Sequence, residues 1–273
     1  MKVKNSIKSS IAVAITAATL FSSCNQQTSN KTSENHAISD TTIHDSITVN
    51  PLTHAKDFPG ANLAISAITS EKLGNDSAKV TIKYTVKNFN LTEQTDHDHH
   101  MANSADGQHI HFILDNTAYT ALYKPEHTVT LPINSEHYLL SFLSRSFHES
   151  IKTKEASKLI KFKIDANGNV EELPSPTEAS VFYSRPKGEY KGEDIKSVLL
   201  DFFLVNTELN INGNKVIANI NGKDFTLDSW SPYEIKNLPL GQNTIKLSLV
   251  DKDGKALTGD NVSVERTITL SDK

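Results

Sequence analysis

The amino-acid sequence predicts an all-β protein built from two tandem immunoglobulin-like β-sandwiches. Three segments, residues 79–86, 159–164 and 244–249, alternate apolar and polar residues with a period of two. That period is typical of half-buried strands. Two Asp-x-x-Gly sequences, at residues 165–168 and 251–254, follow such segments and indicate hairpin turns. No long amphipathic helical pattern accompanies them, which favours the all-β class.

An internal repeat accounts for two sandwiches rather than one large sheet. The matching blocks keep the order of their Asn, Leu and Leu-Pro positions: residues 84–91 with 202–209, 114–119 with 220–225, and 131–143 with 238–250. Two copies of one unit of about 100 residues explain this order. We therefore expect a first, histidine-rich sandwich at residues 58–175 and a second sandwich at residues 176–273.

The first 24 residues have the features of a bacterial lipoprotein signal peptide. Three lysines open the chain, and an apolar run of 11 residues follows at positions 11–21. That run is too short for a membrane-spanning helix, which needs about 20 residues. Small residues then lead directly to Cys24, the only cysteine. This order predicts cleavage before Cys24 and lipidation of its side chain.

Residues 25–57 are predicted to form a disordered tether between the membrane and the sandwiches. Of the 26 residues at positions 25–50, 15 are Ser, Thr, Asn or Gln. So polar a segment cannot bury enough apolar surface to offset its ordering entropy. With the acyl chains as anchor, we expect a protein of a Gram-negative cell envelope, on the periplasmic or surface side of the outer membrane.

Charge and motifs exclude several classes of function. The chain has 28 Lys and Arg against 32 Asp and Glu, and this net charge of -4 argues against nucleic acid as a partner. No Gly-x-Ser-x-Gly sequence, Cys–His pair or phosphate-binding glycine loop is present. Glu171 and Glu172 are adjacent, so on a strand they face opposite ways and cannot act as an acid–base pair. We therefore expect a binding protein and not an enzyme.

The histidines are concentrated in the first copy of the repeat. Eight of the 11 lie between His97 and His148, and the second copy has none. The first copy also carries 12 additional residues, close to positions 95–106, which include three of these histidines. The repeated fold therefore does not require imidazoles at these positions.

The histidine spacing predicts a metal site. In a strand, His109 and His111 point to one face while Ile110 and Phe112 point to the other. Neutral imidazole is a common ligand of copper (Cu) and zinc (Zn). Because the only cysteine, Cys24, is expected to be lipidated, a thiolate zinc site and a blue-copper centre are excluded. Further ligands are expected from neighbouring strands or from the inserted loop. The candidates are His137, His148, His97, His99 and His100.

Two other interpretations of the histidines stay open at this stage. His109 and His111 could line a polar sheet face, and the inserted loop could be a solvated segment. The histidines would then be incidental, and the protein would be an interaction module for an envelope protein, a peptide or a glycan.

Several motifs resemble a group of uncharacterised Gram-negative lipoproteins that are often catalogued as "phosphopeptide-binding protein". The motifs lie at residues 107–116, 136–140, 142–150, 182–190 and 200–206. Among them, Ser144-Arg145-Ser146-Phe147-His148 is similar to the Ser-Arg-x-His turn of forkhead-associated domains, with one extra residue before the histidine. The resemblance implies phosphopeptide binding through Arg145. The alternative is that Arg145 ends a strand and pairs with Glu149.

Overall fold

The computed structural model describes residues 46–53, 57–96 and 101–273, which form four β-sheets. The all-β prediction is confirmed, because the helices of the described residues are two short 3-10 turns, η1 (Lys154–Ala156) and η2 (Gly192–Ile195). In this part of the chain no helix has the length and apolar character needed to cross a bilayer. The predicted signal peptide with Cys24, and His97, His99 and His100 of the inserted loop, lie outside the described residues.

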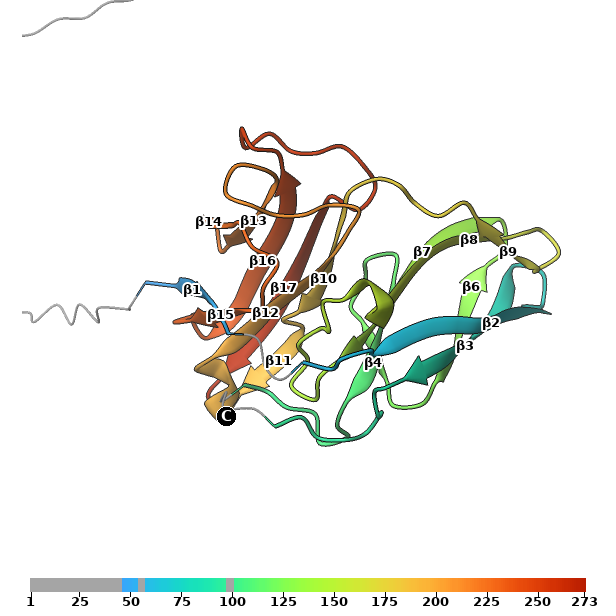
Figure 1. Ribbon diagram of the computed structural model, residues 1–273, viewed down its shortest axis with the longest axis horizontal. Coiled ribbons are helices and arrows are strands. Elements are labelled where there is room, and N and C mark those ends of the chain that lie inside the picture. Colours follow the sequence, from blue (N-terminus) through green and yellow to red (C-terminus); the bar gives the residue numbers. More distant parts are fainter. Residues whose placement is uncertain (1–45, 54–56, 97–100) are drawn as a thin grey trace, which may run out of the picture. The chain divides into compact units, whose positions relative to one another are not determined.

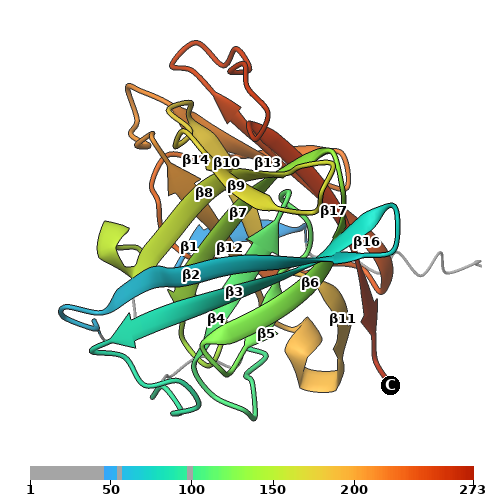
Figure 2. The same cartoon turned by 90° about the vertical axis from the view of Figure 1, so that its right-hand side faces the viewer.

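Two sheets enclose the core of the first sandwich (Figures 1 and 2). The three-stranded sheet, nearest the viewer in Figure 2, has the order β2 (Asn62–Leu73), β3 (Ser77–Lys87) and β6 (Glu126–Pro132). The five-stranded sheet has the order β5 (Thr120–Leu122), β4 (His109–Leu114), β7 (Ser135–Ser144), β8 (Ser157–Ile164) and β9 (Val170–Leu173). Alternate residues of the facing strands, such as Val80, Ile110 and Leu143, fill the space between the sheets.

The second sandwich also consists of two sheets. One has the order β1 (Thr48–Pro51), β15 (Tyr233–Lys236), β12 (Val198–Val205) and β10 (Ser180–Arg185). The other has the order β11 (Gly188–Lys191), β17 (Ser263–Ser271), β16 (Gly241–Val250), β13 (Lys215–Ile220) and β14 (Lys223–Leu227). Its core includes Phe202, Val216 and Leu247.

Strand β1 corrects the predicted extent of the tether. Residues 48–51 lie inside the segment predicted to be disordered, yet they pair with β15 in register, with Thr48 opposite Lys236. The physical reason is tertiary packing, since Ile47 and Val49 alternate with polar residues and pack against the core of the second sandwich. The polar composition of the whole segment concealed this short alternating stretch.

Equivalent turns support the internal repeat. Asp115 and Asn221, 106 positions apart, follow β4 and β13 and both have positive φ, at 51° for each. In each copy the side chain of this residue accepts a hydrogen bond from a backbone N–H three strands further along the chain, at Tyr138 of β7 and at Thr244 of β16. Asp and Asn tolerate this left-handed conformation better than most residues, and the same local solution is used twice.

The two Asp-x-x-Gly sequences form the predicted turns. Asp165 accepts backbone hydrogen bonds from residues 167 and 169, and Asp251 accepts the equivalent bonds from residues 253 and 255. Gly168 and Gly254 have positive φ of 82° and 79°. These carboxylates therefore satisfy the backbone of their own turns.

The two sandwiches pack against each other through strands that are buried on both faces. On β4 and β7, Ile113, Leu140 and Phe142 point away from the first core, and they meet Phe182 and Phe203 of the second sandwich. This contact explains why β4, β10, β12 and the second half of β7 are buried at nearly every position and not at alternate ones.

Polar side chains complete this interface. The amide of Asn116 donates to the carbonyl of Val181 and accepts from the N–H of Tyr183. On the same interface Asp201, fully buried on β12, accepts hydrogen bonds from Ser150 and Lys152 of the first sandwich. Buried polar groups paired in this way fix the relative position of the two sandwiches.

Candidate metal centre

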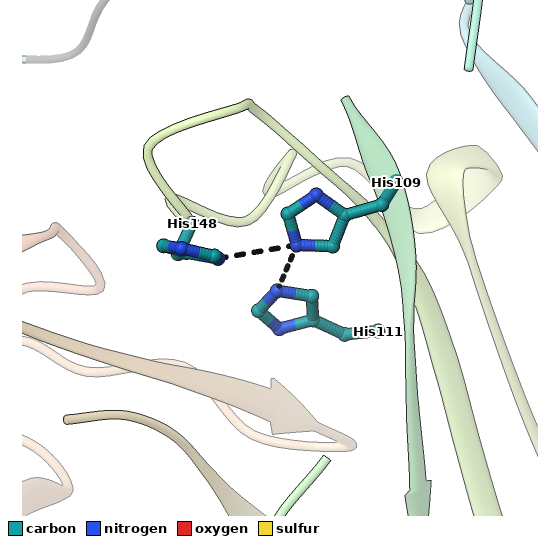
Figure 3. A group of neighbouring side chains, drawn as sticks. All are labelled: His109, His111 and His148. Carbon is teal, nitrogen blue, oxygen red and sulfur yellow. Dashed lines mark hydrogen bonds between the residues drawn. The ribbon is translucent and has the colours of Figure 1, made fainter. Parts of the chain in front are cut away.

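His109 and His111 lie on the outer face of β4, which is the face covered by the second sandwich. They pair with Ser144 and Phe142 of β7, and both side chains are fully buried. Figure 3 shows the two imidazoles side by side, with their Nε2 atoms 2.9 Å apart. The prediction that both rings share one face is confirmed.

His148 joins these two rings from the loop that follows β7 (Figure 3). The backbone N–H of His148 donates to the carbonyl of Arg145, which closes a tight turn, and the φ of His148 is 72°. A positive φ is uncommon for residues other than Gly, Asn and Asp, and such strain is often found at functional positions. The turn places Nδ1 of His148 3.2 Å from Nε2 of His109.

A backbone carbonyl fixes the tautomer of His109. Nδ1 of His109 lies 2.8 Å from the oxygen of Gly107, and because a carbonyl can only accept, this nitrogen carries the proton. Nε2 therefore presents a lone pair to His111 and His148. Gly107 has a φ of 85°, and a Cβ at this position would lie 2.3 Å from the oxygen of Thr92, so only glycine fits here.

The second sandwich orients His111. Oγ of Ser184 on β10 lies 2.9 Å from Nδ1 of His111, and the ring of Tyr119 stacks on His111 at a centroid distance of 3.6 Å and an angle of 6°. The hydroxyl of Tyr119 also lies 3.1 Å from Nδ1 of His148. The contact of Ser184 is with the nitrogen of His111 that faces away from the other imidazoles, and a hydrogen bond at that nitrogen is the usual way in which metal-bound imidazoles are held.

The distances fit a single ion with few ligands. One ring nitrogen from each histidine can be chosen so that all three lie within 4.8 Å of one another. Two nitrogens bound to one zinc ion at about 2.0–2.1 Å are about 3.3 Å apart in tetrahedral geometry. The distances of 2.9 and 3.2 Å between the imidazoles are close to this value. A small outward movement of the rings would admit the ion.

Burial keeps the three imidazoles neutral. It lowers the pKa of His109 to about 4, an effect that the nearby charges of Arg185 and Lys187 increase. The pKa of His111 lies well below its ordinary value for the same reason, with the neighbouring histidines contributing. Burial and the charge of Arg185 also lower the pKa of His148. Neutral imidazole is the form that binds metals.

His137, another predicted ligand, lies apart from this cluster. Its Nδ1 is 2.7 Å from Oδ2 of Asp115 and its Nε2 is 2.7 Å from Oγ of Ser135, at the other end of β7. The prediction that His137 is a ligand is therefore wrong for this site. His137 shares its face of β7 with Leu139 and Leu143, which line the first core, whereas the residues opposite His109 and His111 are Ser144 and Phe142. His148 is the third member.

Arg145 is held inside the protein and does not face a ligand. Its side chain is buried, its Nη1 is 3.1 Å from Oε1 of Glu149, and it also donates to the carbonyl of Ser150. The alternative prediction, in which Arg145 pairs with Glu149, is confirmed. The phosphate-binding role that the resemblance implies for Arg145 has no support in this geometry, since a buried, paired guanidinium offers no fork to a phosphate.

The sequence did not reveal what the second sandwich adds to the site. Ser184, Arg185 and Lys187 come from β10 and the turn after it, in the copy that has no histidines. The mostly apolar run of β12 was the available signal, because a strand that is apolar at nearly every position is buried on both faces.

Comparisons with known proteins do not contribute to the assignment of the fold or of the site. No family model and no curated protein sequence matches the chain. The fibronectin(III)-like modules of CbhA from Clostridium thermocellum have 11% sequence identity and a TM-score of 0.27, over 83% of this chain and 95% of that one. The two tandem V-type regions of VCBP3, a v-region-containing chitin binding protein, have 8% identity and a TM-score of 0.22, over 82% of this chain and 98% of that one. With both TM-scores below 0.5, the assignment of tandem sandwiches rests on the sheets themselves.

Proposed function

We propose that the protein is a metal-binding module that holds one copper or zinc ion through His109, His111 and His148. The observation that carries this proposal is the convergence of three buried imidazoles, two from β4 and one from a strained turn. A polar sheet face would leave such rings apart and exposed to water. Here Gly107 and Ser184 instead occupy the outer nitrogens of two rings, which directs their Nε2 atoms to one point.

The proposed role is capture, delivery or tolerance of the metal at the cell envelope. As the sequence predicts, lipid chains on Cys24 would hold the protein at the membrane, and residues 25–45 would separate it from the two sandwiches. A three-histidine site without a catalytic nucleophile or acid–base pair suits binding better than catalysis.

Equilibrium dialysis followed by metal analysis tests the proposal. We expect the purified protein, exposed to copper or zinc and dialysed against a weak chelator, to retain about one ion per chain. His137→Gln is the matched control, because this histidine is buried on β7 but lies apart from the cluster, and it should retain the same amount. Retention of no metal, or a stoichiometry that falls in His137→Gln, would contradict the proposed site.

Ser184 offers a test of how His111 is oriented. Ser184→Ala removes the hydrogen-bond partner of Nδ1 of His111 without changing a ligand. We expect the dissociation constant of the metal to rise about 10- to 100-fold, the usual cost of losing such a partner. Competition with a chromophoric chelator measures this change. An unchanged dissociation constant would mean that Ser184 does not position the ligand.

A further inference from the structure

The proposed ligand set carries no negative charge. All three ligands are imidazoles, and among the described residues no carboxylate joins their group. Asp106, the one acid whose charge acts on His109, is exposed. Most divalent sites in proteins include a carboxylate or a thiolate, which offsets the charge of the ion. An ion in this site keeps its full positive charge.

Two cations lie next to the cluster. Nζ of Lys187 is 3.7 Å from the centroid of the Tyr119 ring and donates to the Tyr119 carbonyl, so a single aromatic ring connects this ammonium with His111. The guanidinium of Arg185 is 5.4 Å from the same ring and donates to the hydroxyl of Tyr190. Neither forms an ion pair with a carboxylate among the described residues. Both charges act on all three histidines and lower their pKa values.

There is little room for a water molecule as an additional ligand. His109 and His111 are fully buried, and His148 is 8% exposed. A small cavity borders His148 between Phe147, Arg185 and Tyr190, and it cannot admit a water molecule. The geometry therefore favours an ion that is stable with three nitrogen ligands. Cu(I), a soft monovalent ion, is stable with two or three ligands, whereas zinc is almost always four-coordinate.

The charge of the ion decides between these metals. The repulsion from Arg185 and Lys187 is proportional to the charge of the ion, so a divalent ion meets twice the repulsion of a monovalent one. The desolvation cost rises with the square of the charge and is four times as large. We propose, on the basis of the metal-binding function above, that this three-histidine site selects monovalent Cu(I) over divalent ions.

Lys187→Met provides the test. Methionine keeps the length and the packing of the side chain on Tyr119 but removes the charge. The dissociation constants of Cu(I), kept reduced under anaerobic conditions, and of Zn(II) are each measured by competition with a chromophoric chelator. We expect the wild-type protein to bind Cu(I) at least 100-fold more tightly than Zn(II). In Lys187→Met both ions should bind more tightly than in the wild-type protein. The factor by which the dissociation constant of Zn(II) falls should be the square of the factor for Cu(I), for example about 9-fold against 3-fold.

The outcomes separate this inference from the proposed function. Equal affinities for the two ions, or an equal factor for both ions in Lys187→Met, would overturn the selectivity while leaving the metal site intact. Binding of neither ion would overturn both proposals. Lys246→Met, which removes an exposed lysine of β16, should change neither constant and controls for net charge.

Discussion

The His109→Ala/His111→Ala protein is expected to lose its bound metal altogether. These two side chains supply two of three ligands, and the single nitrogen that is left, on His148, cannot hold an ion against a competing chelator. Loss of one partner that only orients a ligand lowers the metal affinity about 10- to 100-fold. Loss of two ligands should therefore lower it by more than about 1000-fold. Metal analysis after dialysis should show a fall from about one ion per chain to none.

His148→Asn makes this test independent of folding. The double alanine substitution removes two fully buried rings and will lower the free energy of unfolding by several kcal/mol. Asparagine tolerates the positive φ of 72° at position 148, so His148→Asn removes a ligand while the turn is kept. It should bind metal at least about 100-fold more weakly and keep the wild-type circular dichroism spectrum. Wild-type affinity in either variant would contradict the three-histidine site.

The metal-free protein is expected to lose stability steeply in mild acid. In the unfolded chain a histidine has a pKa of about 6.5, whereas burial holds the pKa of His109 at about 4 and that of His111 well below its ordinary value. Between these values the unfolded chain binds protons that the folded protein does not. The free energy of unfolding is therefore at its full value above about pH 6.5, as far as these histidines are concerned, and it decreases as the pH falls towards 4.

Urea unfolding at a series of pH values measures this loss. Each buried histidine changes the free energy of unfolding by up to about 1.4 kcal/mol per pH unit. The three histidines of the cluster together change it by up to about 4 kcal/mol per pH unit near pH 5. The His109→Ala/His111→Ala protein lacks two of them and should show a flatter dependence, although it is less stable at pH 7.5. Parallel curves for the two proteins would show that these imidazoles do not stay neutral in the folded state.

The strand pattern was predictable because each signal is local. The alternation at residues 79–86 corresponds to β3, and the turns at Asp165 and Asp251 follow from the φ that Gly168 and Gly254 permit. Strand β1 escaped prediction because four residues carry too little pattern, and its pairing with β15 depends on a partner nearly 200 positions away. Local sequence contains no information on such a contact.

The candidate site was predictable only in part. The spacing of His109 and His111 fixes their common face, whereas the choice of His148 over His137 depends on the turn that closes at Arg145. The contributions of Ser184 and Lys187 depend on how two sandwiches pack, and that packing arises from apolar side chains spread over four strands. Spacing within one strand gives a face, but only the tertiary contact shows what covers it.

Diffraction at the copper absorption edge locates the ion. Crystals of the protein loaded with one equivalent of copper under reducing conditions should give a single strong anomalous peak. We expect this peak about 2.0–2.2 Å from one ring nitrogen of each of His109, His111 and His148. A peak at His137, at the histidines of positions 97–100 or at the protein surface, with the three buried rings still hydrogen-bonded to one another, would contradict the three-histidine site.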